Sequence, residues 1–118
     1  MRIENTGLEN EVVEFSRLQD IMEDIGFVKA EQWDYERVTF DKKFETKGET
    51  FYLRVQCYTV EGDIGGKYAV VKLLTPLLGK HYYPHGVEYG EGETFPNNVV
   101  SSSNNLLKQV KEGIDKIK

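Results

Sequence analysis

The segment His81–His85 holds the residues with the clearest chemical potential in this chain of 118 residues. Its two histidines, His81 and His85, are the only histidines in the sequence and stand four residues apart. Metal sites use this spacing when one helix face presents both histidines and a third ligand completes the site. Pro84 would break such a helix, and Glu88 is the nearest possible third ligand. We therefore expect no metal or other cofactor here, but a loop packed by its aromatic residues and held by histidine hydrogen bonds.

A catalytic role for either histidine would require a nucleophile or a carboxylate beside it. The single cysteine, Cys57, falls on the core side of a predicted strand, where a thiol behaves as a small buried hydrophobe. The serines of Ser101–Ser103 are typical of a helix start. The glycines of Gly62–Gly66 lack the following helix and lysine of a phosphate loop, so they predict a turn. The sequence therefore predicts no catalytic residue.

Tyrosine and arginine side chains recur along two predicted strands and would share the outward face of a sheet. They could be merely solvated, because cross-strand charged and aromatic pairs stabilise such a face by roughly 0.2–1 kcal/mol each. They could also bind a partner or a small acidic ligand, because Tyr and Arg are favoured at interfaces. Trp33–Tyr35 and the loop His81–Tyr89 would then form the rim. The candidate binding residues are Tyr52, Arg54, Tyr58, His81, Tyr83, His85, Glu88 and Tyr89.

Alternation of apolar and polar residues predicts four strands, at Phe27–Trp33, Arg37–Glu45, Thr50–Val60 and Lys67–Thr75. Short glycine-containing turns join the last three, so the sheet is expected to be antiparallel. A slip of one residue would bury charged side chains, so the pattern also specifies the register of the second and third strands. The expected pairs are Phe44 with Phe51, Phe40 with Val55 and Val38 with Cys57 on the core face, and Asp41 with Arg54, Lys43 with Tyr52 and Arg37 with Tyr58 on the outward face.

Helical periodicity predicts a first helix at Ser16–Ile25. Ser16 and Gln19 fit a capping box at its start, in which each side chain bonds the backbone amide of the other end of the box. Gly26 fits the left-handed residue that ends many helices.

A second helix is expected from beyond Pro96 to about Ile117, with a start at Ser101–Ser103 as the alternative. Pro76 is expected to end the fourth strand. Residues 77–94 contain several glycines and are expected to form one long loop.

Together these elements predict one α+β domain spanning residues 1–118. It has a four-stranded, mainly antiparallel sheet with an N-terminal and a C-terminal helix packed on its apolar face. A chain of this length can form one core without metal or disulfide. The expected core is Leu18, Ile21, Met22, Ile25, Val38, Phe40, Phe44, Phe51, Leu53, Val55, Cys57, Val71, Leu73, Leu106, Val110 and Ile114.

The composition of the chain limits the cellular compartment and the classes of binding partner that we expect. The formal net charge of −5 argues against general nucleic-acid binding, which needs a surplus of Lys and Arg. The start of the chain lacks the basic and apolar regions of a secretory signal, and the apolar runs are too short to span a membrane. With one cysteine and no internal disulfide, a cytoplasmic location is the simplest expectation.

Three stretches carry a resemblance to a known family: Glu4–Leu8, Gln32–Phe40 and Lys72–Tyr89. Over essentially its whole length the chain resembles the YugN-like family, small cytosolic proteins of Bacillus-type bacteria. The resemblance implies an α+β domain of this length. It transfers no catalytic residue.

The function expected from these patterns is a non-catalytic cytosolic binding or protein-interaction module that self-associates. Leu74, Leu77 and Leu78 have no place in the apolar stripes and could serve a subunit contact. The alternative is a small-molecule-binding protein, or a minor enzyme, with a site lined by the His81–Tyr89 loop. We expect neither nucleic acid nor a membrane among the partners.

Overall fold

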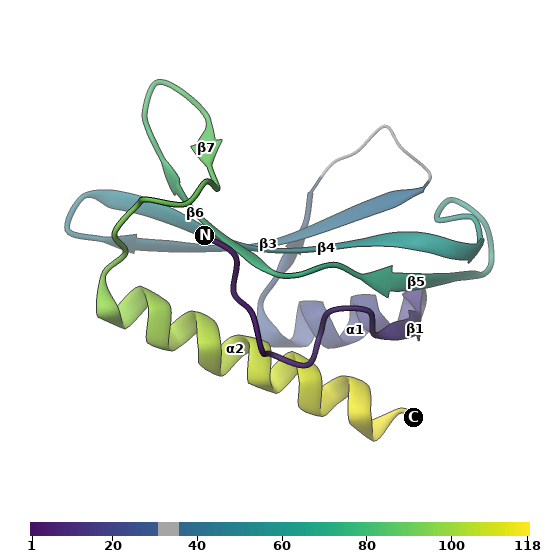
Figure 1. Cartoon of the computed structure of the whole chain (residues 1–118). Coiled ribbons are helices and arrows are strands. Elements are labelled where there is room, and N and C mark those ends of the chain that lie inside the picture. The colour runs from purple at the N-terminus through teal and green to yellow at the C-terminus, as the bar shows by residue number, and fades with distance from the viewer. Residues whose placement is uncertain (31–35) are drawn as a thin grey trace.

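Two helices and a seven-stranded antiparallel sheet make up the fold in the computed structural model, which describes residues 1–30 and 36–118. Figure 1 shows both helices on one side of the sheet, while the hairpin of the last two strands rises from the other side. The elements in chain order are β1 (Val12–Glu14), α1 (Phe15–Ile25), β2 (Val28–Lys29), β3 (Arg37–Thr46), β4 (Glu49–Gly62), β5 (Ala69–Leu73), β6 (Leu77–His81), β7 (Val87–Glu88) and α2 (Asn97–Lys116).

The long strand β4 organises the sheet. One of its edges pairs with β3, and the other pairs first with β6 and then with β5. β1 and β2 extend the sheet beyond β5 and β3, and β7 pairs with β6 alone. The predicted α+β class and antiparallel sheet are confirmed.

The predicted register between β3 and β4 is confirmed at all six pairs. On the core face, Val38, Phe40, Phe51, Leu53 and Val55 are fully buried. On the opposite, outer face, Asp41 lies directly across from Arg54. The alternation predicts the register correctly, because a slip of one residue would exchange the two faces and bury the charged side chains.

The expectation of four strands is wrong, because β1, β6 and β7 also join the sheet. β1 and β7 have three and two residues, too few to show a period of two. In β6, Leu78 and Gly79 are both buried, so alternation is absent there as well. The predicted loop at 77–94 is therefore wrong for much of its length. The fourth predicted strand ends at Leu73 and not at Pro76, and β6 resumes the pairing with β4 at Leu77.

The start of α1 differs from the prediction, because the helix begins at Phe15 and Ser16 lies inside its first turn. The capping box predicted for α1 is wrong: the Ser16 hydroxyl donates to the Glu14 carboxylate, and the Gln19 amide donates to Glu23 at 2.9 Å. Gly26 ends α1 in the left-handed region with φ of 104°, as predicted. Its backbone N–H donates to the carbonyl oxygens of Met22 and Glu23.

α2 begins directly after Pro96, and the alternative start at Ser101–Ser103 is wrong. Val99 is buried in its first turn, which explains why the helix extends that far. Val110 and Ile114 of the apolar stripe are buried as predicted, but between them and Val99 it is Leu107 that is fully buried, while Leu106 is only partly buried. Ser103 is buried within this stripe.

Apolar residues of the sheet and both helices form one buried cluster. Ile21, Ile25, Phe44 and Leu106 of the expected core lie only partly buried at its margin. Leu78, expected at a subunit contact, is instead fully buried. The chain also buries residues that the expected core did not include: Ile3, Leu8, Val13, Phe15, Phe27, Ala69, Phe95, Val99 and Leu107. No helix in the described residues is long and apolar enough to cross a membrane.

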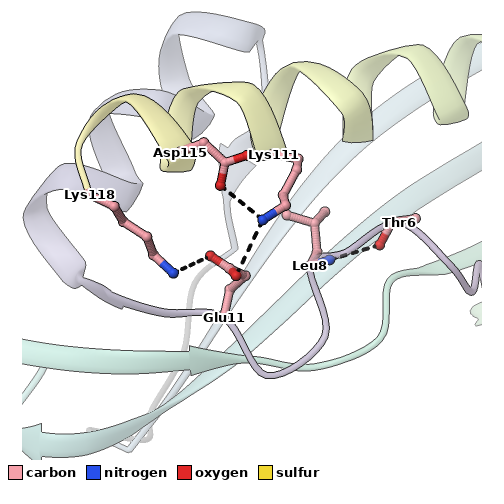
Figure 2. Close-up of polar contacts among 6 residues, drawn as sticks. All are labelled: Thr6, Leu8, Glu11, Lys111, Asp115 and Lys118. Atoms are coloured by element: carbon pink, nitrogen blue, oxygen red, sulfur yellow. Dashed lines mark hydrogen bonds and ion pairs between the residues drawn. The ribbon is translucent and has the colours of Figure 1, made fainter.

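A charged cluster attaches the end of α2 to the segment before β1, as Figure 2 shows. The Glu11 carboxylate lies 2.6 Å from the Lys118 ammonium and 3.4 Å from the Lys111 ammonium. Lys111 also pairs with Asp115 at 2.9 Å, one helical turn away. The hydrogen bond from Lys118 and the charge of Lys111 lower the pKa of Glu11.

Candidate functional site

The outer face of the sheet is built around an ion pair between β3 and β4. Arg54 donates from Nε and Nη2 to the two carboxylate oxygens of Asp41, at 2.9 and 3.0 Å. The side chains of Arg54 and Asp41 are 28% and 18% exposed, so this fork is largely shielded from water. The hydrogen bonds to Asp41 raise the pKa of Arg54. The pair therefore carries no net charge, and its two hydrogen bonds hold the Arg54 guanidinium in one orientation beneath the neighbouring residues.

Tyr89, which follows β7, packs over this pair. The Arg54 guanidinium carbon lies 4.7 Å from the centre of the Tyr89 ring, a cation–π distance. The other support of the ring is Gly79, where an added Cβ would lie 2.6 Å from Tyr89 Cδ1. Burial raises the pKa of Tyr89 to about 12. Its buried hydroxyl has no hydrogen-bond partner within residues 1–30 and 36–118.

Tyr52 and His81 continue the cluster toward β6. Their rings meet edge to face with centres 6.4 Å apart, and Tyr52 lies directly across from Gly79 in the ladder. The structure therefore gathers four candidate residues, Tyr52, Arg54, His81 and Tyr89, along the junction of β4 with β6. Their contacts hold the β6–β7 hairpin, residues 77–88, against the outer face. We call this hairpin the arm.

The other side of the arm is held by a second set of contacts. The Lys80 ammonium lies 3.4 Å from Glu49 and 3.6 Å from Glu93, and 5.2 Å from the centre of the Tyr82 ring. The Tyr82 hydroxyl donates to the Glu93 carboxylate. Because both sides are fixed, the base of the arm has little freedom to bend.

The tip of the arm is exposed. Tyr83 is 89% exposed, and Pro84, His85 and Gly86 are exposed beside it. Figure 1 shows the arm rising from the side of the sheet that the helices leave open. His85 therefore lies at the tip of the arm, away from Arg54 and Tyr89 at its base. Glu88 is exposed on β7, across from Lys80.

Tyr58 lies further along β4 and lines a separate hollow of about 340 Å³. Among the residues that the structure describes, Glu36, Arg37, Thr59 and Leu74 also line it. Leu74, 39% exposed, supplies an apolar wall, and Arg37 is exposed at the start of β3. We call this the Tyr58 hollow. The rim expected at Trp33–Tyr35 lies outside the described residues.

The single cysteine and the possible metal ligands can now be placed. Cys57 is 1% exposed, as predicted, and burial raises the pKa of its thiol to about 12. It therefore stays protonated and inaccessible. Within residues 1–30 and 36–118, no three His, Cys, Asp or Glu side chains are grouped closely enough to hold a metal ion.

Sequence reasoning missed Gly79 as part of this surface, and it named Leu74 as a possible subunit contact without placing it beside Tyr58. Gly79 provides the flat site on which the Tyr89 ring rests, and a glycine within a short apolar run was the only available signal. Leu74 follows the buried end of β5, and only the pairing of β5 with β4 places it beside Tyr58.

The comparisons with known proteins agree with this fold. The pattern of the YugN-like family matches residues 3–116. This chain belongs to the YugN-like family. It is 54% identical over 110 residues to "Uncharacterized protein YlbA" of Bacillus subtilis (strain 168), covering 93% of this chain and 92% of that protein. It is 27% identical over 79 residues to "Uncharacterized protein YugN" of the same organism, covering 66% and 59%.

A family member has a known structure, the "Crystal structure of uncharacterized conserved protein YugN from Geobacillus kaustophilus HTA426". It matches with a TM-score of 0.87 at 58% identity, covering 99% of this chain and 97% of that one. The names of these relatives state no activity, so function rests on the geometry of the surface.

Proposed function

We propose that this member of the YugN-like family is a non-catalytic, single-domain interaction module of the cytosol that binds a protein partner through its arm. The observation that carries this proposal is Tyr83, an aromatic residue 89% exposed at the tip of a hairpin with a fixed base. Large aromatic residues are the commonest anchors of protein interfaces.

The rigidity of the base supports a binding role for the tip. Asp41, Arg54 and Tyr89 hold the arm from the outer face, and Lys80 and Glu93 hold it from the other side. A segment that is already ordered loses little conformational entropy on binding. With the two helices on the opposite side of the sheet, a partner can approach the arm and the outer face together (Figure 1).

The alternative, a small-molecule site lined by the His81–Tyr89 loop, has less support. Such a site would require Arg54, His81 and His85 to converge on one ligand. Arg54 is instead engaged by Asp41 and Tyr89, while His85 lies at the exposed tip.

Photo-crosslinking in the native host tests the proposal. A photoreactive phenylalanine analogue replaces Tyr83 in one strain and Tyr68, an exposed tyrosine before β5, in a control strain. We expect a discrete crosslinked product from position 83 and none from position 68. Equal, diffuse labelling at both positions, or no product at position 83, would contradict a binding role for the arm.

A further inference from the structure

The outer face carries both a projecting element and a hollow. The arm leaves the sheet beside the first half of β4, where β6 pairs with Thr50–Arg54. The Tyr58 hollow lies beside the second half of the same strand. Tyr52 and Tyr58 are six residues apart, which corresponds to about 20 Å along a strand.

The chemistry of the tip fits the hollow. Tyr83 offers an aromatic ring with a hydroxyl at its end, and nearly all of it is exposed. Leu74 and Tyr58 supply apolar contact, and Arg37, which also lines the hollow, carries a guanidinium that can stack on a ring or donate to the phenol oxygen. The hollow, at about 340 Å³, is large enough for one aromatic side chain.

A contact whose two halves lie on one face of the same chain is self-complementary, as a twofold interface requires. Two copies could pack with their outer faces toward each other. A twofold axis that lies between the two sheets and crosses the strands near Gln56 would then place the first half of each β4 opposite the second half of the other. Each arm would then lie over the Tyr58 hollow of the other copy, so the contact would form twice.

The charges near that axis permit the approach. Thr39 and Gln56 are neutral, and the Arg54 charge is compensated by the carboxylate of Asp41. Two copies would therefore bring neutral residues together at the centre of the contact, where repulsion would cost most, while Arg37 and Lys72 lie further along the strands beside Tyr58.

We infer that the partner of the arm is a second copy of this chain, with Tyr83 of each copy seated in the Tyr58 hollow of the other. This inference rests on the proposed function and narrows it. It makes the outer face the interface of a homodimer in which each copy binds the other through the same contact.

Sedimentation velocity of the full-length protein over a concentration series tests the dimer. We expect wild type to dimerise reversibly, and Tyr83→Ala and Leu74→Glu each to weaken dimerisation by about tenfold or more, as for interface anchors. Tyr68→Ala, which removes another exposed tyrosine, should leave the dimer unchanged. Circular dichroism checks the fold of each variant, and Arg37→Glu is a second hollow variant should Leu74→Glu unfold.

Mixing the two weakened variants tests the reciprocal geometry. A pair of Tyr83→Ala with Leu74→Glu retains one intact contact, in which the second chain's Tyr83 occupies the first chain's hollow. We expect this mixture to form heterodimers more tightly than either variant forms homodimers. A monomeric wild type, a dimer insensitive to Tyr83, or a mixture no tighter than its components would overturn the inference.

The two proposals fail in different ways. A crosslink from position 83 to a different protein, with wild type monomeric, would support an interaction module and reject the homodimer. A crosslink with the mass of two copies supports both. No crosslink from position 83 together with a Tyr83-insensitive dimer would reject both.

Discussion

Single residues of the outer face contact one another as well as water. Asp41 and Arg54 are matched across two strands, and their bidentate geometry orients the guanidinium under the Tyr89 ring. Tyr89 in turn rests on Gly79, where only a hydrogen atom fits. A chain of four residues thus connects the central ladder to the arm.

A double-mutant cycle measures the central pair. Replacing Asp41 with Asn and Arg54 with Gln, singly and together, is expected to show a favourable coupling of about 1–3 kcal/mol, because both hydrogen bonds are charge-assisted and shielded. Chemical denaturation supplies the free energies of unfolding. The matched control is the exposed pair of Lys43 and Glu45, for which we expect no measurable coupling. Equal coupling in the two pairs would contradict the role of shielding.

At the scale of elements, the arm depends on the absence of a side chain in β6. We expect Gly79→Ala to destabilise the protein by about 1–3 kcal/mol, because the new methyl group would meet both the Tyr89 ring and the Glu88 carbonyl oxygen. Gly86→Ala at the tip is the control, since an added Cβ there meets nothing within 4 Å. Thermal and urea denaturation give both values. Similar losses in the two variants would show that the Tyr89 contact is unimportant.

The end of α2 should give the protein part of its acid sensitivity. The pKa of Glu11 in the folded protein is lowered from 4.5. The contribution of Glu11 to the free energy of unfolding is therefore present above pH 4.5 and is lost as pH falls through the folded-state pKa. We expect Glu11→Gln to cost about 1 kcal/mol at pH 7, after allowance for partial solvent screening. The cost should disappear well below pH 4.5.

Urea denaturation of wild type and Glu11→Gln at several pH values measures this effect. Glu9→Gln is the control, because Glu9 is exposed two residues away. A difference between wild type and Glu11→Gln that persists unchanged into acid would mean that packing, not the charge of Glu11, stabilises the end of α2.

At the scale of the whole molecule, β4 should be the most stable element. It pairs along both edges, and its inward side chains Phe51, Leu53 and Val55 are fully buried. We expect its amide hydrogens to exchange only through global unfolding, whereas those of residues 83–86 at the tip exchange fastest. Hydrogen–deuterium exchange mass spectrometry measures both. Protection at the tip in the monomer would contradict the exposed arm, while protection only at high concentration would accompany dimerisation.

The sequence alone determined the features that depend on local periodicity. Alternation in β3 and β4 specified two faces and a register, because each residue is committed to one side and a slip exchanges the sides. The pairing of Asp41 with Arg54 and the burial of Cys57 followed from that register. The end of α1 at Gly26 followed from helix chemistry, whereas the structure decided between the two starts expected for α2.

Only the tertiary structure decided the arm and the hollow. β6 contains neighbouring buried residues, Leu78 and Gly79, and β7 is two residues long, so neither shows a period. β6 is a strand because β4 offers it an unpaired edge, and β7 in turn pairs with β6. Tyr89 is placed by a glycine ten residues earlier and an arginine on another strand. Such contacts join distant residues without a repeating pattern. The candidate residues were therefore visible in the sequence, but their division between a fixed base, an exposed tip and a separate hollow was not.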